Sequence, residues 1–144
     1  MDEKISKKQK MRSEEKYERP FKSKNFADAM KNAVTGIFYT IRTQTNIKIQ
    51  LGVAIIVIIL AAILKAQMIE IICLTISIFL VLFAEMLNTA IETTVDLITQ
   101  EYNIKAKIAK DIMAGAVLLT SINSIIVGFL IFFEKILNWG QSLF

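Results

Sequence analysis

Residues 112–133 of this 144-residue chain read IMAGAVLLTSINSIIVGFLIFF and carry no charged side chain. About 20 apolar residues in a helix are enough to cross the hydrocarbon layer of a bilayer, so this stretch predicts a transmembrane helix. Its one amide near the middle, Asn123, predicts a hydrogen bond to another helix. The whole chain is 54% hydrophobic and only 21% charged, and nine of its 17 basic residues fall within the first 24 positions. This segregation of charge argues against an ordinary water-soluble domain.

Two further apolar stretches precede this one. Residues 49–64 carry no charge and are flanked by Lys48 and Lys65, whose long side chains can reach toward lipid headgroups. Another apolar run begins at Met68 and is interrupted only by Glu70 and Glu85. Together with the polar linkers, the three stretches predict an all-α membrane protein with transmembrane helices at 47–65, 68–98 and 111–134.

The sequence before the first span divides into a tail and a helix. Residues 1–22 are polar and mixed in charge, and such a composition cannot bury enough apolar surface to fold, so they predict a disordered basic cytoplasmic tail. This tail is either simply solvated or attracted to anionic headgroups. Residues 24–45 place apolar side chains at helical spacing and predict an amphipathic surface helix, at the membrane interface, against other helices, or both. Residues 23–144 are therefore expected to form a single membrane domain.

The distribution of lysine and arginine predicts how the chain is oriented in the membrane. Residues 1–48 hold 12 of these basic residues and residues 99–110 hold three, whereas the opposite side has only Lys65 and Lys135. Basic residues favour the cytoplasmic side, so the N-terminus is expected inside and the C-terminus outside. Three spans require the same arrangement of the termini.

A row of polar residues continues the second apolar stretch. Residues 85–96 read EMLNTAIETTVD. At about 100° per residue, Asn88, Glu92 and Asp96 lie within roughly 60° of Glu85, so one helix face is expected to carry three carboxylates and an amide. Rising about 1.5 Å per residue, the helix places Glu85 roughly 26 Å from its start, at the edge of a hydrocarbon layer about 30 Å thick. Glu92 is expected about 10 Å farther out.

Acids at two depths fit the transfer of a phosphoryl group from a soluble nucleotide to a lipid hydroxyl. A base at the hydrocarbon boundary can take the hydroxyl proton, and an outer acid can hold a divalent cation with its phosphates. Two structural alternatives stay open: Glu85 is a neutral packing residue, or the outer acids are an ordinary solvated helix end. The chain has no histidine and one cysteine, Cys73, which excludes a histidine-based metal site and an intrachain disulfide. Neither familiar glycine-rich nucleotide-binding motif occurs.

The polar row and the segment after it resemble a known family. Residues 85–98, EMLNTAIETTVDLI, followed by AKDIMAGA at 109–116, resemble the small bacterial membrane lipid kinases, the prokaryotic diacylglycerol kinase and undecaprenol kinase family. The resemblance covers roughly residues 24–133 and is greater to the Gram-positive undecaprenol kinase branch. It implies a multi-pass homotrimer in the bacterial cytoplasmic membrane, with an interfacial N-terminal helix. It also implies transfer of the ATP γ-phosphate to a membrane lipid alcohol, undecaprenol or diacylglycerol, with Mg²⁺ as cofactor and no nucleic acid partner.

The resemblance further implies roles for individual residues. Glu85 would be the catalytic base and Asn88 a polar partner in the same site. Glu92 would bind the divalent ion carried by the nucleotide. The remaining cofactor-binding positions would be Gln44, Glu101, Tyr102, Asn103, Lys110 and Asp111, with Gln44 as the second metal position.

Three positions depart from the family pattern. Gln44 stands where the family usually has a glutamate that helps to hold the metal, Gln50 replaces an acid or histidine, and Asn25 replaces a common arginine. A neutral amide is a weaker ligand for a hard cation, so the departures motivate an alternative: a low-activity or inactive paralogue that binds nucleotide or lipid as a regulatory or assembly subunit. A small transporter is a weaker alternative, because the acids cluster at one end of one helix.

Overall fold

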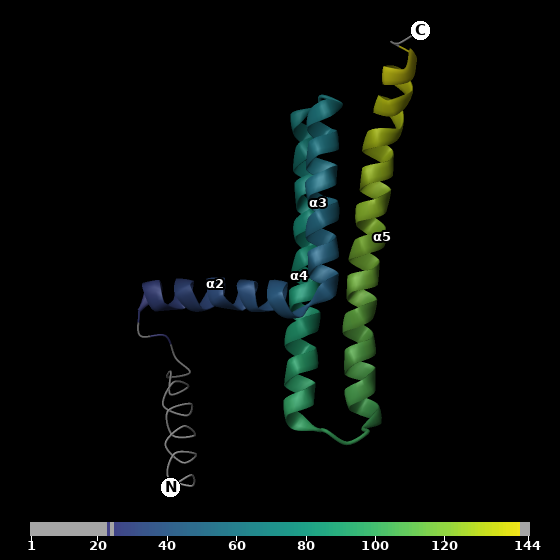
Figure 1. Ribbon diagram of the computed structural model, residues 1–144. Helices are drawn as coiled ribbons and strands as arrows, with labels where there is room; N and C mark the ends of the chain where they lie inside the picture. Colours follow the sequence, from purple (N-terminus) through teal and green to yellow (C-terminus); the bar gives the residue numbers. More distant parts are fainter. Residues whose placement is uncertain (1–22, 24, 142–144) are drawn as a thin grey trace, which may run out of the picture. The chain divides into compact units, whose positions relative to one another are not determined.

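The computed structural model describes residue 23 and residues 25–141, leaving aside the side chains of residues 138–141. Every element in these ranges is a helix (Figure 1), and the helices are α2 (Phe26–Thr43), α3 (Thr45–Ile63), α4 (Met68–Ile98) and α5 (Ile104–Gln141). Three of them, α3, α4 and α5, are long and apolar enough to cross a membrane. The predicted all-α class with three candidate spans is therefore confirmed. The tail predicted over residues 1–22 lies outside the described residues.

Helix α2 begins at a side-chain cap. The Asn25 Oδ1 accepts a hydrogen bond of 2.8 Å from the backbone N–H of Asp28, which satisfies one of the donors left free at a helix start. Apolar side chains recur along the helix, and several are exposed, among them Phe26, Met30 and Phe38. The chain divides into two compact units within α2, one up to Gly36 and one from Ile37 onward. A place for α2 at the membrane interface stays a prediction.

Helices α3 and α4 are joined by a tight turn. Lys65 adopts the left-handed conformation, with φ of 49°, and the backbone N–H of Ala66 bonds to the carbonyl of Ala61 at 2.8 Å. This is the pattern in which a helix end closes on itself and its last carbonyl groups are satisfied. A new helix starts at once, because Gln67 and Glu70 form a reciprocal capping box at the N-terminus of α4. The short turn makes α3 and α4 antiparallel neighbours.

Helix α4 contacts both α3 and α5 and is the central element of the three (Figure 1). The apolar core contains Ala61 from α3, Leu74 from α4 and Phe132 from α5, all at least 92% buried. Small residues on α3 allow this contact, because an alanine leaves room for larger side chains of the other helices. The core lies near the α3–α4 turn, away from the α4–α5 loop. An ion pair of 2.9 Å between Glu70 and Lys135 joins α4 and α5 at the same end.

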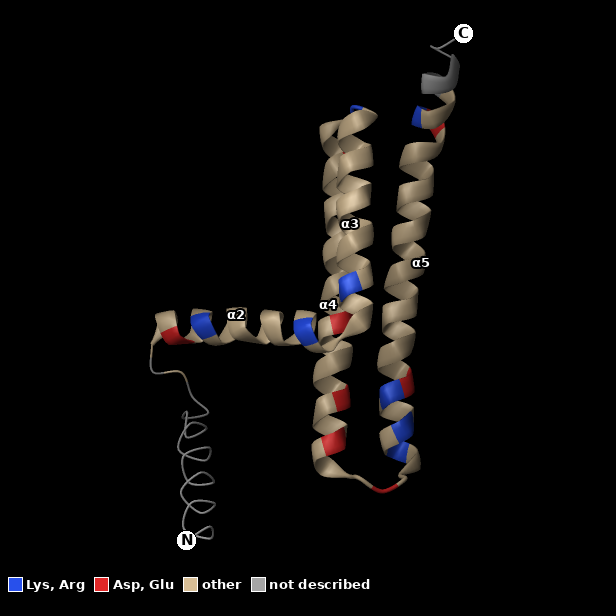
Figure 2. Ribbon diagram, in the orientation of Figure 1, with Lys and Arg blue, Asp and Glu red and all other residues tan. Residues whose placement is uncertain are grey.

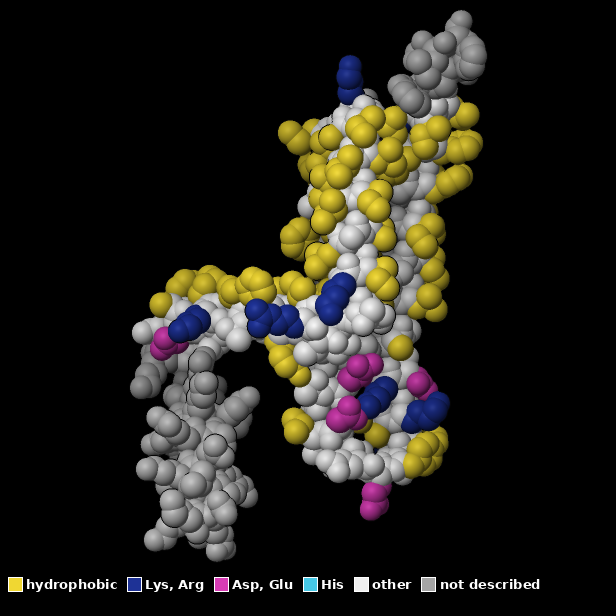
Figure 3. Space-filling model, in the orientation of Figure 1, with side chains coloured by type: hydrophobic (Ala, Val, Ile, Leu, Met, Phe, Trp, Pro, Cys, Tyr) yellow, Lys and Arg dark blue, Asp and Glu magenta, His cyan; other side chains and the backbone are white. Residues whose placement is uncertain are grey.

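Charged and apolar side chains occupy different parts of the three long helices. Figure 2 shows uncharged stretches along α3, α4 and α5, with the acids of α4 and the lysines of α5 near the loop that joins them. On the face shown in Figure 3, apolar side chains are numerous along the remainder of these helices. Many of these apolar side chains are exposed, for example Ile56, Phe79 and Ile125. This is the surface expected where the solvent is lipid rather than water.

Truncation of Leu74 and of Ile76, both on α4, is expected to lower the stability by different amounts, because only Leu74 lies in the core. Leu74→Ala leaves a cavity between three helices and is expected to lower the free energy of unfolding by about 2–5 kcal/mol. Ile76→Ala is the matched control, because Ile76 is 55% exposed and fills no such space. Denaturation of the detergent-solubilised protein, followed by circular dichroism, measures both. Equal losses for the two variants would contradict this core.

Candidate functional site

The polar row on α4 begins with a deeply buried carboxylate. Glu85 is only 1% exposed and is the largest fully buried side chain among the described residues. Asn88 and Thr89, on the next turn, are 8% and 5% exposed. The Asn88 Nδ2 donates a 3.0 Å hydrogen bond to the Glu92 Oε1, so these two positions of the predicted row share one face. The helix therefore carries its polar row from the protein interior toward the α4–α5 loop.

Glu85 has a side-chain partner on α3. The Gln50 Nε2 donates a hydrogen bond of 3.4 Å to the Glu85 Oε2. A neutral amide compensates only part of the cost of removing a carboxylate from water, and this bond is long. Such a carboxylate gains from any further donor, including a hydroxyl group of a ligand. The arrangement suits a group that accepts a proton from a substrate.

Two buried acceptor atoms beside Glu85 have no hydrogen-bond partner within the described residues. They are the Gln50 Oε1 and the Asn88 Oδ1. Buried polar atoms are almost always paired, because an unpaired one costs about 1–3 kcal/mol. The two oxygens are therefore positions where a bound donor or cation would be stabilised.

A cleft of about 560 Å³ lies where α4 and α5 meet. Four of its charged side chains form two ion pairs: the Lys110 Nζ lies 2.5 Å from the Asp96 Oδ1, and the Lys107 Nζ lies 2.8 Å from the Asp111 Oδ2. The first pair connects α5 with α4, and the second lies within one turn of α5. Lysines and acids so arranged can exchange their partners for phosphate oxygens and a cation.

The cleft depends on a short loop between two capped helices. α4 ends at Ile98, and the Asn103 Oδ1 accepts hydrogen bonds from the backbone N–H groups of Lys105 at 2.9 Å and Ala106 at 3.3 Å. Asn103 is thus the N-cap of α5. The polar segment 99–110, which the sequence indicates only as a link between spans, is already helical from Ile104. This extension brings Lys107 and Lys110 over the last turns of α4.

The predicted site residues fall into three places. Glu85, Asn88 and Glu92 form the row on α4. Gln44 is the N-cap residue of α3, and no hydrogen bond or ion pair joins it to Glu92 within the part of the chain described. The other predicted positions line the cleft together: Glu101, Tyr102, Asn103, Lys110 and Asp111.

The donor set is sparse for a metal ion. The described residues contain no group of three or more carboxylate or thiol side chains arranged to hold one. Glu92 offers a carboxylate, and the unpartnered Asn88 Oδ1 offers an amide oxygen on the same face. Mg²⁺ in nucleotide sites is usually held by one or two carboxylates together with phosphate oxygens and water. These residues fit a magnesium ion that arrives with its nucleotide, and do not form a complete cage.

One contribution was missed by reasoning from the sequence. Gln50 appears there only as a departure from a family pattern, yet it is the side-chain partner of Glu85. Its amide, in an otherwise uncharged apolar run, was the available indication. Lys107, one of the three lysines that the sequence places between the second and third spans, lines the cleft and pairs with Asp111.

Comparisons with known proteins agree on one family. The family model described as prokaryotic diacylglycerol kinase matches residues 31–132. A protein of Synechocystis named diacylglycerol kinase is 41% identical over 105 residues, which cover 72% of this chain and 60% of the relative's length. A protein of Bacillus subtilis named undecaprenol kinase is 39% identical over 111 residues, which cover 77% of this chain and 90% of the relative. The family match spans the residues of both the polar row and the cleft.

The cap of α5 can be tested separately from any activity. Asn103→Ala removes the acceptor for two backbone donors and is expected to destabilise the first turn of α5 by about 1 kcal/mol. Hydrogen exchange of residues 105–107 should then become about fivefold faster. Asn103→Asp keeps an acceptor oxygen and should preserve slow exchange. Equal exchange in both variants would show that Asn103 does not cap the helix.

Proposed function

Because the chain belongs to the prokaryotic diacylglycerol kinase family, a family of lipid kinases, we propose that it transfers the γ-phosphate of ATP to the hydroxyl of a membrane lipid alcohol. The acceptor classes are those in the names of its relatives, undecaprenol first and diacylglycerol second. The observation that carries the proposal is the position of Glu85, a buried carboxylate on the same helix that leads to a charged cleft.

Glu85 and the cleft are separated by a distance that suits one membrane-bound and one water-soluble substrate. Glu85 and Asp96 are eleven residues apart, which is about 16 Å along α4. A lipid alcohol reaches the inner place with its chain still in the membrane, and a nucleotide reaches the outer cleft from water. The reacting phosphate must lie between them, beside Asn88 and Glu92. A single rigid helix thus holds both substrates in register, which is the main requirement of phosphoryl transfer.

The proposed reaction assigns one task to each group. The Glu85 carboxylate takes the hydroxyl proton while the lipid oxygen bonds to the γ-phosphorus, and the bond to the β-phosphate oxygen breaks to release ADP. Asn88 orients Glu92 through its 3.0 Å hydrogen bond. Lys110 and Asp111, with Glu101, Tyr102 and Asn103, bind the nucleotide in the cleft. Bound Mg²⁺ would neutralise phosphate charge. Glu92 and the Asn88 Oδ1 would hold it on α4, and Gln44, at the start of α3, is the second position that the family resemblance implies.

We infer that the protein lies in the bacterial cytoplasmic membrane with the cleft on the cytoplasmic side. The three apolar helices and the family support a membrane protein. The excess of lysine and arginine before α3 and around the α4–α5 loop favours an internal N-terminus and an external C-terminus. ATP is then available at the cleft.

A homotrimer is proposed as the assembly. Asn123 was expected to bond to another helix, but it is exposed on α5 in the described chain. A mid-membrane amide on a lipid-facing surface is unfavourable, and an interhelical hydrogen bond removes that cost. Contact with a second copy would supply the partner. The alternative of a non-enzymatic paralogue is not favoured by the family or by the names of the relatives.

The base assignment is tested by Glu85→Gln. This change keeps the size of the side chain and removes its ability to take a proton, so kcat for lipid phosphorylation should fall by about 10²–10⁴-fold. Glu134→Gln is the matched control, because Glu134 is exposed near the opposite end of the bundle. Labelled ATP with undecaprenol and, separately, diacylglycerol in nanodiscs measures the rates. Equal rates for Glu85→Gln and wild type would exclude Glu85 as the base.

The metal assignment is tested by Gln44→Glu. A carboxylate adds an anionic ligand, so the magnesium concentration needed for half-maximal activity should fall. Asn46→Asp adds the same charge two residues away on an exposed position and serves as the control. A magnesium titration of the initial rate, at fixed ATP, separates the two variants. If both variants lower the required magnesium concentration equally, the effect comes from the added negative charge alone. Gln44 is then not a metal ligand.

A further inference from the structure

Asp96 carries the last carboxylate of the polar row on α4, one helical turn beyond Glu92. Residues four apart on a helix lie on one face, with roughly 6 Å between their Cβ atoms. Glu92 is half-buried and Asp96 is exposed, and Asp96 also lines the cleft between α4 and α5. The two carboxylates thus lie where the row leaves the protein interior and meets the cleft.

A buried amide oxygen lies beside the inner of these two carboxylates. Asn88 is 8% exposed, and its Nδ2 donates to the Glu92 Oε1 at 3.0 Å, so its amide group is directed toward Glu92. The other atom of the same amide, Oδ1, is buried and has no hydrogen-bond partner within the described chain. Carboxylate and amide oxygens are the protein ligands that Mg²⁺ and Mn²⁺ prefer. Asn88, Glu92 and Asp96 therefore offer three such ligands on consecutive turns of one helix.

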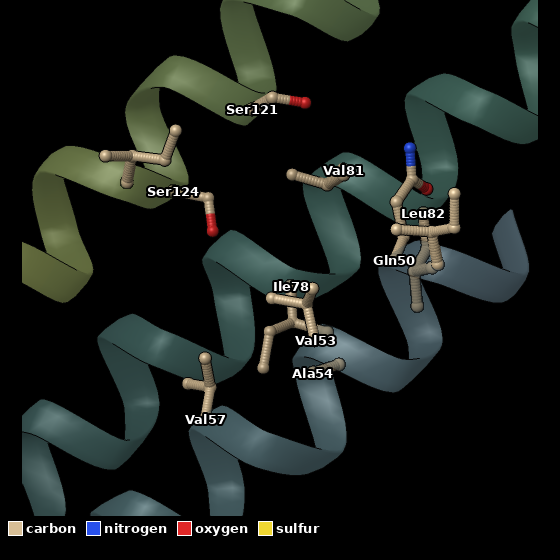
Figure 4. Close-up of a pocket in the computed structure, with 11 residues that line it drawn as sticks. Gln50, Val53, Ala54, Val57, Ile78, Val81, Leu82, Ser121 and Ser124 are labelled. Carbon is tan, nitrogen blue, oxygen red and sulfur yellow. The ribbon is translucent and has the colours of Figure 1, made fainter. Parts of the chain in front are cut away.

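The space on the inner side of the row is unsuited to a cation. Figure 4 shows the crevice of about 220 Å³ that lies there between α3, α4 and α5. Its lining contains no charged side chain and is aliphatic apart from Gln50, Ser121 and Ser124. A cation that entered it would lose its hydration without gaining an anionic partner from the lining. A metal ion at Glu92 is therefore best held from the outer side, where Asp96 is the next carboxylate of the row.

The ion-pair partner of Asp96 belongs to the same cleft. The Lys110 Nζ lies 2.5 Å from the Asp96 Oδ1, and this pair joins α5 to α4. A nucleotide with a bound divalent ion brings both signs of charge to the cleft, so phosphate oxygens can take Lys110 while the metal takes Asp96. Each side chain then exchanges one oppositely charged partner for another. The exchange costs little, because the side chains of Lys110 and Asp96 are 35% and 66% exposed and the existing pair is screened by water.

We propose that Asp96 is a ligand of the divalent ion that the nucleotide carries, together with Glu92 and the Asn88 Oδ1. The inference rests on the proposed function and adds a metal ligand on α4 to the same site. It gives the ion a second anionic ligand, which the neutral Gln44 does not supply. The ligand class is a magnesium or manganese complex of a nucleoside diphosphate or triphosphate.

Binding of a metal nucleotide tests the ligand without any requirement for catalysis. The full chain in nanodiscs is titrated with the manganese complex of ADP, with free Mn²⁺ measured by electron paramagnetic resonance, and separately with ADP and a chelator by calorimetry. Asp96→Asn is expected to weaken binding of the manganese complex about tenfold. Binding of metal-free ADP should stay at least as tight, because Lys110 is then available to phosphate. Equal weakening of both ligands would show that Asp96 acts only through Lys110 and would overturn the proposal.

Exchange of the ligand atom tests coordination directly. In a Cys73→Ser background, Asp96→Cys places a thiolate in the row, and thiolates favour the softer Cd²⁺ over Mg²⁺. Calorimetry should then show an increase of about tenfold in the affinity for the cadmium complex of ADP relative to the magnesium complex. Asp111→Cys is the matched control, because Asp111 lines the same cleft and pairs with Lys107 on α5. No increase for Asp96→Cys, or an equal increase for Asp111→Cys, would overturn the proposal.

The same measurements distinguish failure of this inference from failure of the proposed function. Metal-dependent nucleotide binding that requires Asp96, without phosphorylation of any lipid alcohol, would keep the ligand and remove the kinase assignment. Lipid phosphorylation by the wild type, with binding of the manganese complex unchanged in Asp96→Asn, would keep the kinase assignment and remove the ligand.

Discussion

The burial of Glu85 is the constraint on which the rest of the site depends. A carboxylate that is 1% exposed must be compensated by other polar groups, and the described chain supplies one amide on α3 and polar residues one turn along α4. Buried apolar residues flank these groups, Ile47 on α3 and Ala84 on α4. Leu74, in the apolar core, lies eleven residues before Glu85, which is about three helical turns. The polar row and the packed core therefore occupy different stretches of the same helix.

The length of α4 allows one helix to serve both substrates of the proposed reaction. Its 31 residues extend about 46 Å, well beyond a hydrocarbon layer of about 30 Å. A helix of this length that starts at one edge of the layer would carry Glu92 and Asp96 past the other edge without interruption. Because the backbone hydrogen bonds of a helix are internal, this continuity costs no unsatisfied groups at the boundary. In the proposed reaction, helix rise alone would separate the lipid-facing and water-facing steps.

The sequence was sufficient for the number of spanning helices and the order of polar residues along α4, since both follow from composition and helical periodicity. It did not indicate that Gln50 contacts Glu85, 35 residues away. That contact depends on how α3 and α4 are rotated about their axes, which packing at Ala61 and Leu74 decides and a single helix pattern does not. The early start of α5 was also missed, because the capping bonds of Asn103 are recognisable only once the loop length is known.

The glutamine at position 50 has a physical consequence for the site. An acid at that position would place a second negative charge beside Glu85, and two carboxylates in apolar surroundings cannot both stay ionised at little cost. The amide instead offers a donor to Glu85 and keeps an acceptor for a ligand, with no added charge. Gln50 departs from the family pattern, yet in this packing its amide is compatible with the role proposed for Glu85. Gln44 differs, because it occupies the N-cap position of α3, outside the buried row, and its side chain makes no capping hydrogen bond.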